Sequence, residues 1–209
     1  MRKFVIGFVS AIAVATTMGS VPVSAADSPI DPAVRAIKSF YATLIDTMKH
    51  GKELGLEGRV RELKPATEST FDLTEMTRLS VGPSWSGISE PDRKALVDAV
   101  ERLTVTNYAK NFSQFSGEQF VVEPDAKPRS DDKIVQSKLM TSNGTQVPFN
   151  YRMHAVDGQW KIVDIYLNGN ISQLALRRAD FQSTVQKLGP SGLVDKLNQL
   201  VNQQIASNK

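Results

Sequence analysis

The sequence predicts an α+β domain in which a four-stranded antiparallel sheet is covered by helices on one side. Three observations predict this class. Residues 31 to 115 carry apolar side chains at helical spacing. Between residues 119 and 167 the spacing changes to every second residue, and Asn-Gly and Asp-Gly pairs separate the segments. Helical spacing then returns as far as residue 201, and this order of elements is typical of α+β domains.

The composition is that of one globular domain of moderate size. The chain has 209 residues, of which 41% are hydrophobic and 22% are charged. It has no cysteine and two histidines, His50 and His154. A disulfide framework, a thiolate metal site and a thiol nucleophile are therefore excluded, and a multi-histidine metal centre is not expected. We expect neither a metal nor another cofactor.

The N-terminus has the pattern of an export signal. Arg2 and Lys3 precede the apolar run 4–14, and Val23-Ser24-Ala25 supplies small residues for a signal peptidase. The alternative is an uncleaved anchor helix, but polar residues interrupt the run before the ~20 apolar residues that a membrane span needs. We expect residues 1–25 to be a signal peptide cleaved after Ala25, and residues 26–209 to form a single domain.

Removal of this segment also changes the charge of the protein. The full chain has a formal net charge of +3, and two of its basic residues, Arg2 and Lys3, would be lost. The basic and acidic side chains of the mature chain are then nearly balanced, so no basic tract remains for nucleic-acid binding. An exported, nearly neutral chain without cysteine indicates the periplasm of a Gram-negative cell.

The first helices are predicted from caps and periodicity. Asp31 and Pro32 suit the N-cap and first position of a helix that runs to about Met48. Gly51 is expected to end it in the left-handed conformation. A second helix is predicted over 56–68, with a bend or break at Pro65.

Two more helices precede the strands. Asp72 to Glu75 reads as a capping box that opens a short helix. The glycine-containing segment 81–87 is predicted to be a loop. Ser89 then caps a long helix that extends to Phe115.

Four segments read as antiparallel strands: 119–123, 133–140, 146–156 and 159–167. A two-residue turn at Asp157-Gly158 sets the expected pairing of the last two. It places Met153 opposite Ile162, Tyr151 opposite Asp164, and Phe149 opposite Tyr166. The alternate residues Asn150, Arg152 and His154 are expected to face solvent. Two helices, over 172–188 and about 193–201, finish the chain on either side of Gly189-Pro190.

No arrangement of catalytic groups is evident. The sequence lacks a Gly-x-Ser-x-Gly motif and a phosphate-binding glycine loop. Asp164 is the exception, because the predicted pairing places its carboxylate on the apolar face, where it needs a partner. One interpretation is a general base in an apolar pocket. The other is a structural carboxylate bonded to Tyr151, a helix N-terminus, Arg177 or Arg178.

The apolar stripes of the helices are expected to converge on one face of the sheet. They can form a closed core, or they can leave an apolar pocket. Periodicity does not separate the two, because cores and pocket linings use the same residues.

Several segments resemble the MlaC (toluene-tolerance) family, in order and spacing. They are Phe71 to Gly82, Trp85, Ser89 to Arg93, Thr106 to Ala109, Val147 to Arg152, Asp157 to Asp164 and Gly169 to Phe181. One segment departs from typical members, since Asn170 to Phe181 contains Arg177-Arg178 where a Tyr-Arg pair is usual. This variant is similar to the hopanoid-associated HpnM branch.

The resemblance implies an NTF2-like sheet with added N- and C-terminal helices that enclose an apolar cavity. It implies a periplasmic lipid carrier and not an enzyme, with a phospholipid or hopanoid as cargo. The partners it implies are an inner-membrane lipid transporter complex and an outer-membrane component, on which a monomer docks transiently. The lipid-binding positions it implies are Phe71, Met76, Leu79, Val100, Tyr108, Phe149, Tyr151, Met153, Trp160, Ile162 and Tyr166.

Overall fold

The structure is a computed structural model that describes residues 29–207. The predicted signal peptide, residues 1–25, lies outside the described residues. The helices are α1 (Pro32–Lys49), α2 (Gly51–Thr70), α3 (Leu73–Val81), the 3-10 helix η1 (Gly82–Gly87), α4 (Glu90–Asn111) and α5 (Gln173–Ala206). Among the helices of residues 29–207, none combines the length and the apolar content that a membrane span requires.

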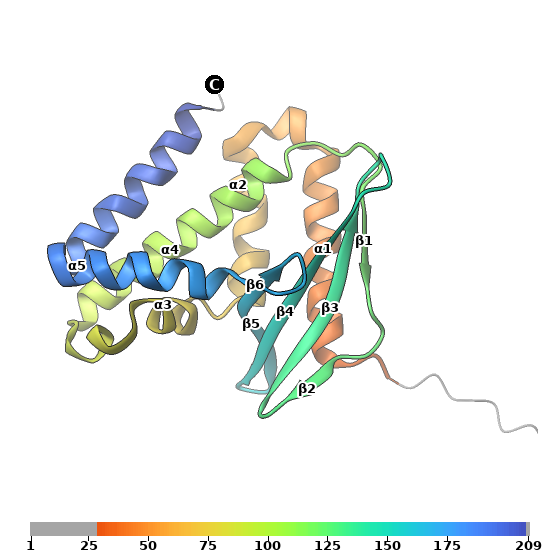
Figure 1. Ribbon diagram of the computed structural model, residues 1–209. Coiled ribbons are helices and arrows are strands. Elements are labelled where there is room, and N and C mark those ends of the chain that lie inside the picture. Colours follow the sequence, from red (N-terminus) through yellow and green to blue (C-terminus); the bar gives the residue numbers. More distant parts are fainter. Residues whose placement is uncertain (1–28, 208–209) are drawn as a thin grey trace, which may run out of the picture.

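The strands form one antiparallel sheet that lies beside the helices (Figure 1). They are β1 (Gln119–Val122), β2 (Lys127–Arg129), β3 (Asp132–Met140), β4 (Gln146–Val156), β5 (Gln159–Leu167) and β6 (Ile171–Ser172). Their order is β1-β3-β4-β5-β6, and β2 also pairs with β3. The α+β class and the antiparallel sheet are confirmed. The prediction of four strands is wrong, since β2 and β6 are too short to show a period-two pattern.

The predicted N-caps are confirmed by their hydrogen bonds. Asp31 accepts from the Ala33 amide at 2.8 Å, and Asp72 accepts from the Glu75 amide at 2.8 Å. Ser89 accepts from the amide at the start of α4 at 3.3 Å. Each bond satisfies an N–H group that the first turn of a helix leaves without an intrahelical partner.

The prediction for Gly51 is wrong. It is the first residue of α2, and the left-handed residue is Gly55, with φ 59°. Gly51 is required for a different reason, because a Cβ atom there would lie 1.9 Å from the carbonyl oxygen of Ser113. This close approach of two backbones fixes the corner between α1 and α2.

Helix α5 consists of two helical halves joined at Gly189. The φ and ψ of Gly189 are 72° and 179°, a conformation that belongs to glycine, and Pro190 follows it. The predicted break at Gly189-Pro190 is therefore confirmed. Figure 1 shows the second half of α5 turning back along α4.

The apolar side chains form two clusters, and α4 contributes to both. The first, which we call the sheet cluster, joins α1, α2 and α4 to the sheet; it includes Phe40, Leu44, Phe71, Tyr108, Tyr151, Met153 and Ile162. The second, the helix cluster, lies among α3, α4 and α5; it includes Val81, Leu96, Val100, Phe181, Leu193 and Leu197. The expectation that all apolar stripes meet at one sheet face is thus wrong.

The pairing of β4 with β5 changes partway along the strands. Near the turn, Met153 pairs with Ile162, as predicted. The next pair is Arg152 with Asp164, so Val163 is an extra residue in β5. Such a β-bulge moves all later residues of the strand to the opposite face. The two other predicted pairs are consequently wrong, because Tyr151 pairs with Ile165 and Phe149 with Leu167.

Candidate functional site

One cavity lies among three helices. It has a volume of about 720 Å³ and is lined by α2, α4 and the second half of α5. We call it the helical groove. Its apolar lining consists of Leu56, Val60, Val105, Val201 and Ile205. Charged side chains also line it, and several of them pair with one another: Lys64 with Glu68 and Glu101, and Lys94 with Asp98.

A second cavity lies between the sheet and the helices, at the end of β5 where α5 begins. It has a volume of about 350 Å³, and we call it the sheet-end pocket. Volumes of about 300–1,000 Å³ are typical of ligand sites. The last turns of α4, the bulged side of the β4–β5 pair and the first turn of α5 form its walls. Its lining residues are Asn107, Tyr108, Asn111, Phe112, Phe149, Ile165, Leu167, Gln173 and Arg177.

The aromatic lining of the sheet-end pocket continues into the sheet cluster. The rings of Tyr108 and Phe112 stack with their centroids 5.8 Å apart. Behind them, the ring of Phe40 lies edge-on to Tyr108 at 5.1 Å and to Phe71 at 5.3 Å. The pocket is therefore the open end of a packed aromatic cluster, and its floor is rigid.

The first two turns of α5 cover the sheet-end pocket without strong apolar anchoring. The fully buried residues of α5 begin at Phe181, so the segment 173–180 contains none, and Leu176 is 62% exposed. Polar bonds hold this segment instead. Ser172 caps the helix by accepting from the Ala175 amide at 2.9 Å. Segments with few buried apolar contacts open at the lowest free-energy cost.

Asp164 anchors this segment to the sheet. Its carboxylate is 3% exposed and accepts three hydrogen bonds. The donors are the Ser172 hydroxyl at 2.6 Å, the Leu174 amide at 3.0 Å and the Ile165 amide at 2.8 Å. Of the two interpretations of Asp164, the bonds match the structural one, in which the carboxylate bonds a helix N-terminus.

The predicted lipid-binding residues fall into several environments. Two of them, Tyr108 and Phe149, line the sheet-end pocket. Phe71, Met76, Tyr151, Met153 and Ile162 are buried in the sheet cluster, and Trp160 packs against it. Val100 belongs to the helix cluster, and Leu79 is half-buried on α3. Tyr166 pairs with Asn150, and its hydroxyl accepts from Arg129 at 2.6 Å, because the bulge turns it away from Phe149.

Sequence reasoning missed Ile165 and Leu167 as lining residues. Both lie after the bulge, so simple alternation assigned them to the wrong face. The polar lining residues Asn107, Asn111 and Gln173 were also missed, and they carry no periodic signal. Phe112 could have been found, because it lies on the same apolar stripe of the long helix as Tyr108.

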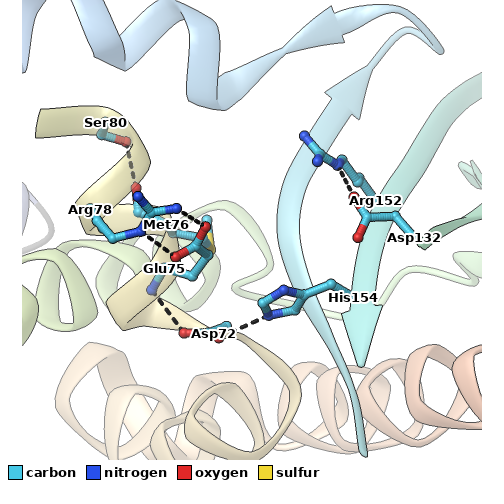
Figure 2. Close-up of polar contacts among 8 residues, drawn as sticks. All are labelled: Asp72, Glu75, Met76, Arg78, Ser80, Asp132, Arg152 and His154. Atoms are coloured by element: carbon cyan, nitrogen blue, oxygen red, sulfur yellow. Dashed lines mark hydrogen bonds and ion pairs between the residues drawn. The ribbon is translucent and has the colours of Figure 1, made fainter. Parts of the chain in front are cut away.

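On the opposite face of β4, polar side chains form hydrogen bonds to neighbouring elements. Figure 2 shows His154 pointing at Asp72, the N-cap of α3, with Nε2 2.9 Å from a carboxylate oxygen. Arg152 donates to Asp132 at 2.5 Å. The expectation that these side chains face solvent is therefore only partly met. These bonds tie α3 and β3 to the central strand.

Burial changes the proton affinity of the groups near the pocket. Desolvation raises the pKa of Tyr41 to about 12, although hydrogen bonds to Ser137 and Tyr151 oppose this. Burial also raises the pKa of Tyr108 and of Tyr151 well above the ordinary value. All three hydroxyls are thus neutral across the physiological range, both that of Tyr108 in the pocket wall and those of Tyr41 and Tyr151 in the sheet cluster. Within residues 29–207, no group of three His, Cys, Asp or Glu side chains could hold a metal ion.

Comparison with protein families identifies the class of protein. The family model described as MlaC protein matches residues 38–199 of the chain. This match includes every helix and strand described above apart from parts of α1 and α5. The chain therefore belongs to the MlaC family.

A solved structure confirms the fold. It is described as the phospholipid-binding protein from Ralstonia solanacearum in complex with a phospholipid. The TM-score is 0.73 at 21% sequence identity, and the match covers 83% of this chain and 99% of the other. A comparison with curated proteins gave no significant match.

Proposed function

We propose that this protein is a periplasmic lipid carrier. In this proposal it binds the acyl tails of a phospholipid or a hopanoid-type lipid and shuttles the lipid as a monomer. It docks transiently on an inner-membrane lipid transporter complex and on an outer-membrane component. Membership in the MlaC family and the lipid-bound structural neighbour support this function. We also propose that the sheet and its enclosing helices are NTF2-like, and that the protein belongs to the HpnM branch of the family.

We place the tails in the sheet-end pocket. The observation that carries this choice is a cavity between the sheet and the helices whose apolar side consists of Tyr108, Phe112, Phe149, Ile165 and Leu167. The helical groove is larger, but charged pairs such as Lys64–Glu101 and Lys94–Asp98 line it. Tails bound there would lie against charges whose desolvation is costly.

Loading of a whole lipid requires the pocket to widen. Each methylene exposed to water costs ~0.8 kcal/mol, so a carrier must surround most of each tail. A volume of about 350 Å³ accommodates only part of a two-chain lipid. The first two turns of α5 are the segment that can move, because they bury no side chain fully. Apolar contact with the tails would offset the cost of opening.

Asp164 as the general base of an enzyme is the alternative function. No observation favours it. Its carboxylate already accepts three hydrogen bonds, and it is not part of the lining of the sheet-end pocket. A general base must reach the proton of a bound substrate.

Two matched substitutions test the position of the tails. Ile165 and Val60 are both half-buried, and both pack against the sheet cluster, but they line different cavities. Ile165→Trp fills the sheet-end pocket, and Val60→Trp fills the helical groove. We expect Ile165→Trp to lose co-purified lipid and Val60→Trp to retain the wild-type amount. Organic extraction followed by mass spectrometry measures lipid per protein, and circular dichroism checks folding.

The outcomes separate the site from the function. Loss of lipid in Val60→Trp alone would assign the tails to the helical groove and contradict the site. Retention of lipid in both variants would also contradict the sheet-end pocket as the site of the tails. Wild-type protein that contains no lipid and takes up none from phospholipid vesicles would contradict the function itself.

A further inference from the structure

One cation lies in the lining of the sheet-end pocket. Arg177 is half-buried there, on the first turns of α5, whereas its neighbour Arg178 is exposed. No ion pair or hydrogen bond joins the guanidinium of Arg177 to another group in the part of the chain that the structure describes. Two lysines of the helical groove differ, since Lys64 and Lys94 each pair with carboxylates.

Asp164 makes no direct ion pair with Arg177. Its negative charge is near enough to favour the charged guanidinium, but its oxygens accept from Ser172, Leu174 and Ile165 and not from Arg177. Burial lowers the pKa of Arg177, and this loss of hydration is the main effect on the group. A cation that has lost hydration and has no ion-pair partner is strongly stabilised when an anion binds to it.

Neutral hydrogen-bonding groups line the same pocket as the cation. Asn107, Asn111 and Gln173 line the same pocket, and each amide carries two N–H donors. The side-chain oxygen of Asn107 accepts from Gln204 at 2.8 Å, which orients its own amide nitrogen away from that bond. The polar side of the pocket thus offers a guanidinium and several amide donors, and the other side is aromatic and aliphatic.

We propose that Arg177 binds the phosphate group of a phospholipid whose tails lie in the sheet-end pocket. This inference rests on the proposed carrier function and narrows its cargo. A guanidinium matches phosphate oxygens with two parallel hydrogen bonds, and the adjacent amides complete the set of donors. The apolar wall favours a phosphate ester that carries tails over free phosphate. A hopanoid without phosphate would leave Arg177 without a partner.

A pair of lipids that differ in the phosphate tests the inference. Dioleoyl phosphatidic acid and dioleoylglycerol have the same tails, and each is offered to lipid-free protein in identical detergent micelles. We expect wild-type protein to prefer phosphatidic acid by about tenfold or more, the value of a charge-assisted hydrogen bond. Arg177→Gln removes this preference, which is measured as the ratio of the two affinities so that a general change in the pocket cancels. Arg178→Gln, the matched control, retains it, and Arg177→Lys retains part of it.

Each contrary result has a distinct meaning. Equal binding of the two lipids by wild-type protein, or a preference that survives in Arg177→Gln, would overturn the role of Arg177 while the carrier function stands. Inorganic phosphate that raises the Tm of wild-type protein but not of Arg177→Gln, without a lipid preference, would indicate a free-anion site and overturn the lipid assignment. Failure of both lipids to bind would instead count against the carrier function.

Discussion

Asp164 connects the sheet to the movable part of α5. Its three hydrogen bonds involve the residue after it, the N-cap Ser172 and the amide of Leu174. Buried polar groups of this kind contribute mainly because the loss of one partner leaves the others unsatisfied. At this position the carboxylate therefore sets how firmly α5 is held over the pocket.

The substitution Asp164→Asn tests this role. An amide replaces one acceptor oxygen with a donor, so it cannot accept from both Ser172 and the backbone amides. We expect the free energy of unfolding to fall by about 1–3 kcal/mol, measured by urea denaturation. Asp131→Asn changes an exposed carboxylate and is expected to have no effect. Equal stability of Asp164→Asn and wild type would show that the anchor is unimportant.

The raised pKa of Tyr41 predicts how the free energy of unfolding changes at alkaline pH. Its pKa is about 12 in the folded protein and about 10 in an unfolded chain. Below about pH 10 both states are protonated, and above it the unfolded state releases its proton first, so stability falls. We expect a loss on the order of 1 kcal/mol from this residue by about pH 11. Urea midpoints between about pH 8 and about pH 11 should fall less steeply for Tyr41→Phe than for wild type.

The roles of individual residues were the hardest feature to predict from the sequence. The apolar identity of Tyr151 and Met153 was evident from alternation, and both are buried. The strand partner of Asp164 was not, because one extra residue at Val163 changes every later pair. A bulge of this kind depends on the packing of both strands, and a single strand carries no local signal for it.

At the scale of elements, Gly189 decides the path of α5. Its left-handed φ of 72° lets the second half turn back and bury Leu193 and Leu197 in the helix cluster. Glycine before proline predicted this break, since both residues end helices for known steric reasons. The short strands β2 and β6 gave no comparable signal and were missed.

The substitution Gly189→Ala tests the break. A Cβ atom at this backbone conformation costs about 1–3 kcal/mol, so we expect a lower Tm. Gly87→Ala is the control, because Gly87 is exposed and a Cβ atom there meets nothing within 4 Å. Thermal unfolding by circular dichroism measures both. An unchanged Tm in Gly189→Ala would mean that the turn between the halves tolerates another backbone conformation.

At the scale of the molecule, two apolar clusters share one helix. One side of α4 places Val105 and Tyr108 in the sheet cluster, and another places Val100 and Leu103 in the helix cluster. The helical stripes were predictable, but their division between two clusters was not, because periodicity identifies an inward face without naming its partner. The sheet-end pocket borders the sheet cluster through Tyr108, Phe112, Phe149 and Ile165, and this position also could not be predicted.

The bulge in β5 has a consequence for changes in chain length. Deletion of Val163 would restore strict alternation, exchange the faces of Asp164 and Ile165, and place a carboxylate against the aromatic floor. A conventional side-chain replacement at the same position leaves the backbone count unchanged and preserves the pocket wall. At Val163 the protein is therefore expected to tolerate a substitution better than a deletion. Only the deletion changes both the pocket wall and the bonds of Asp164 to α5.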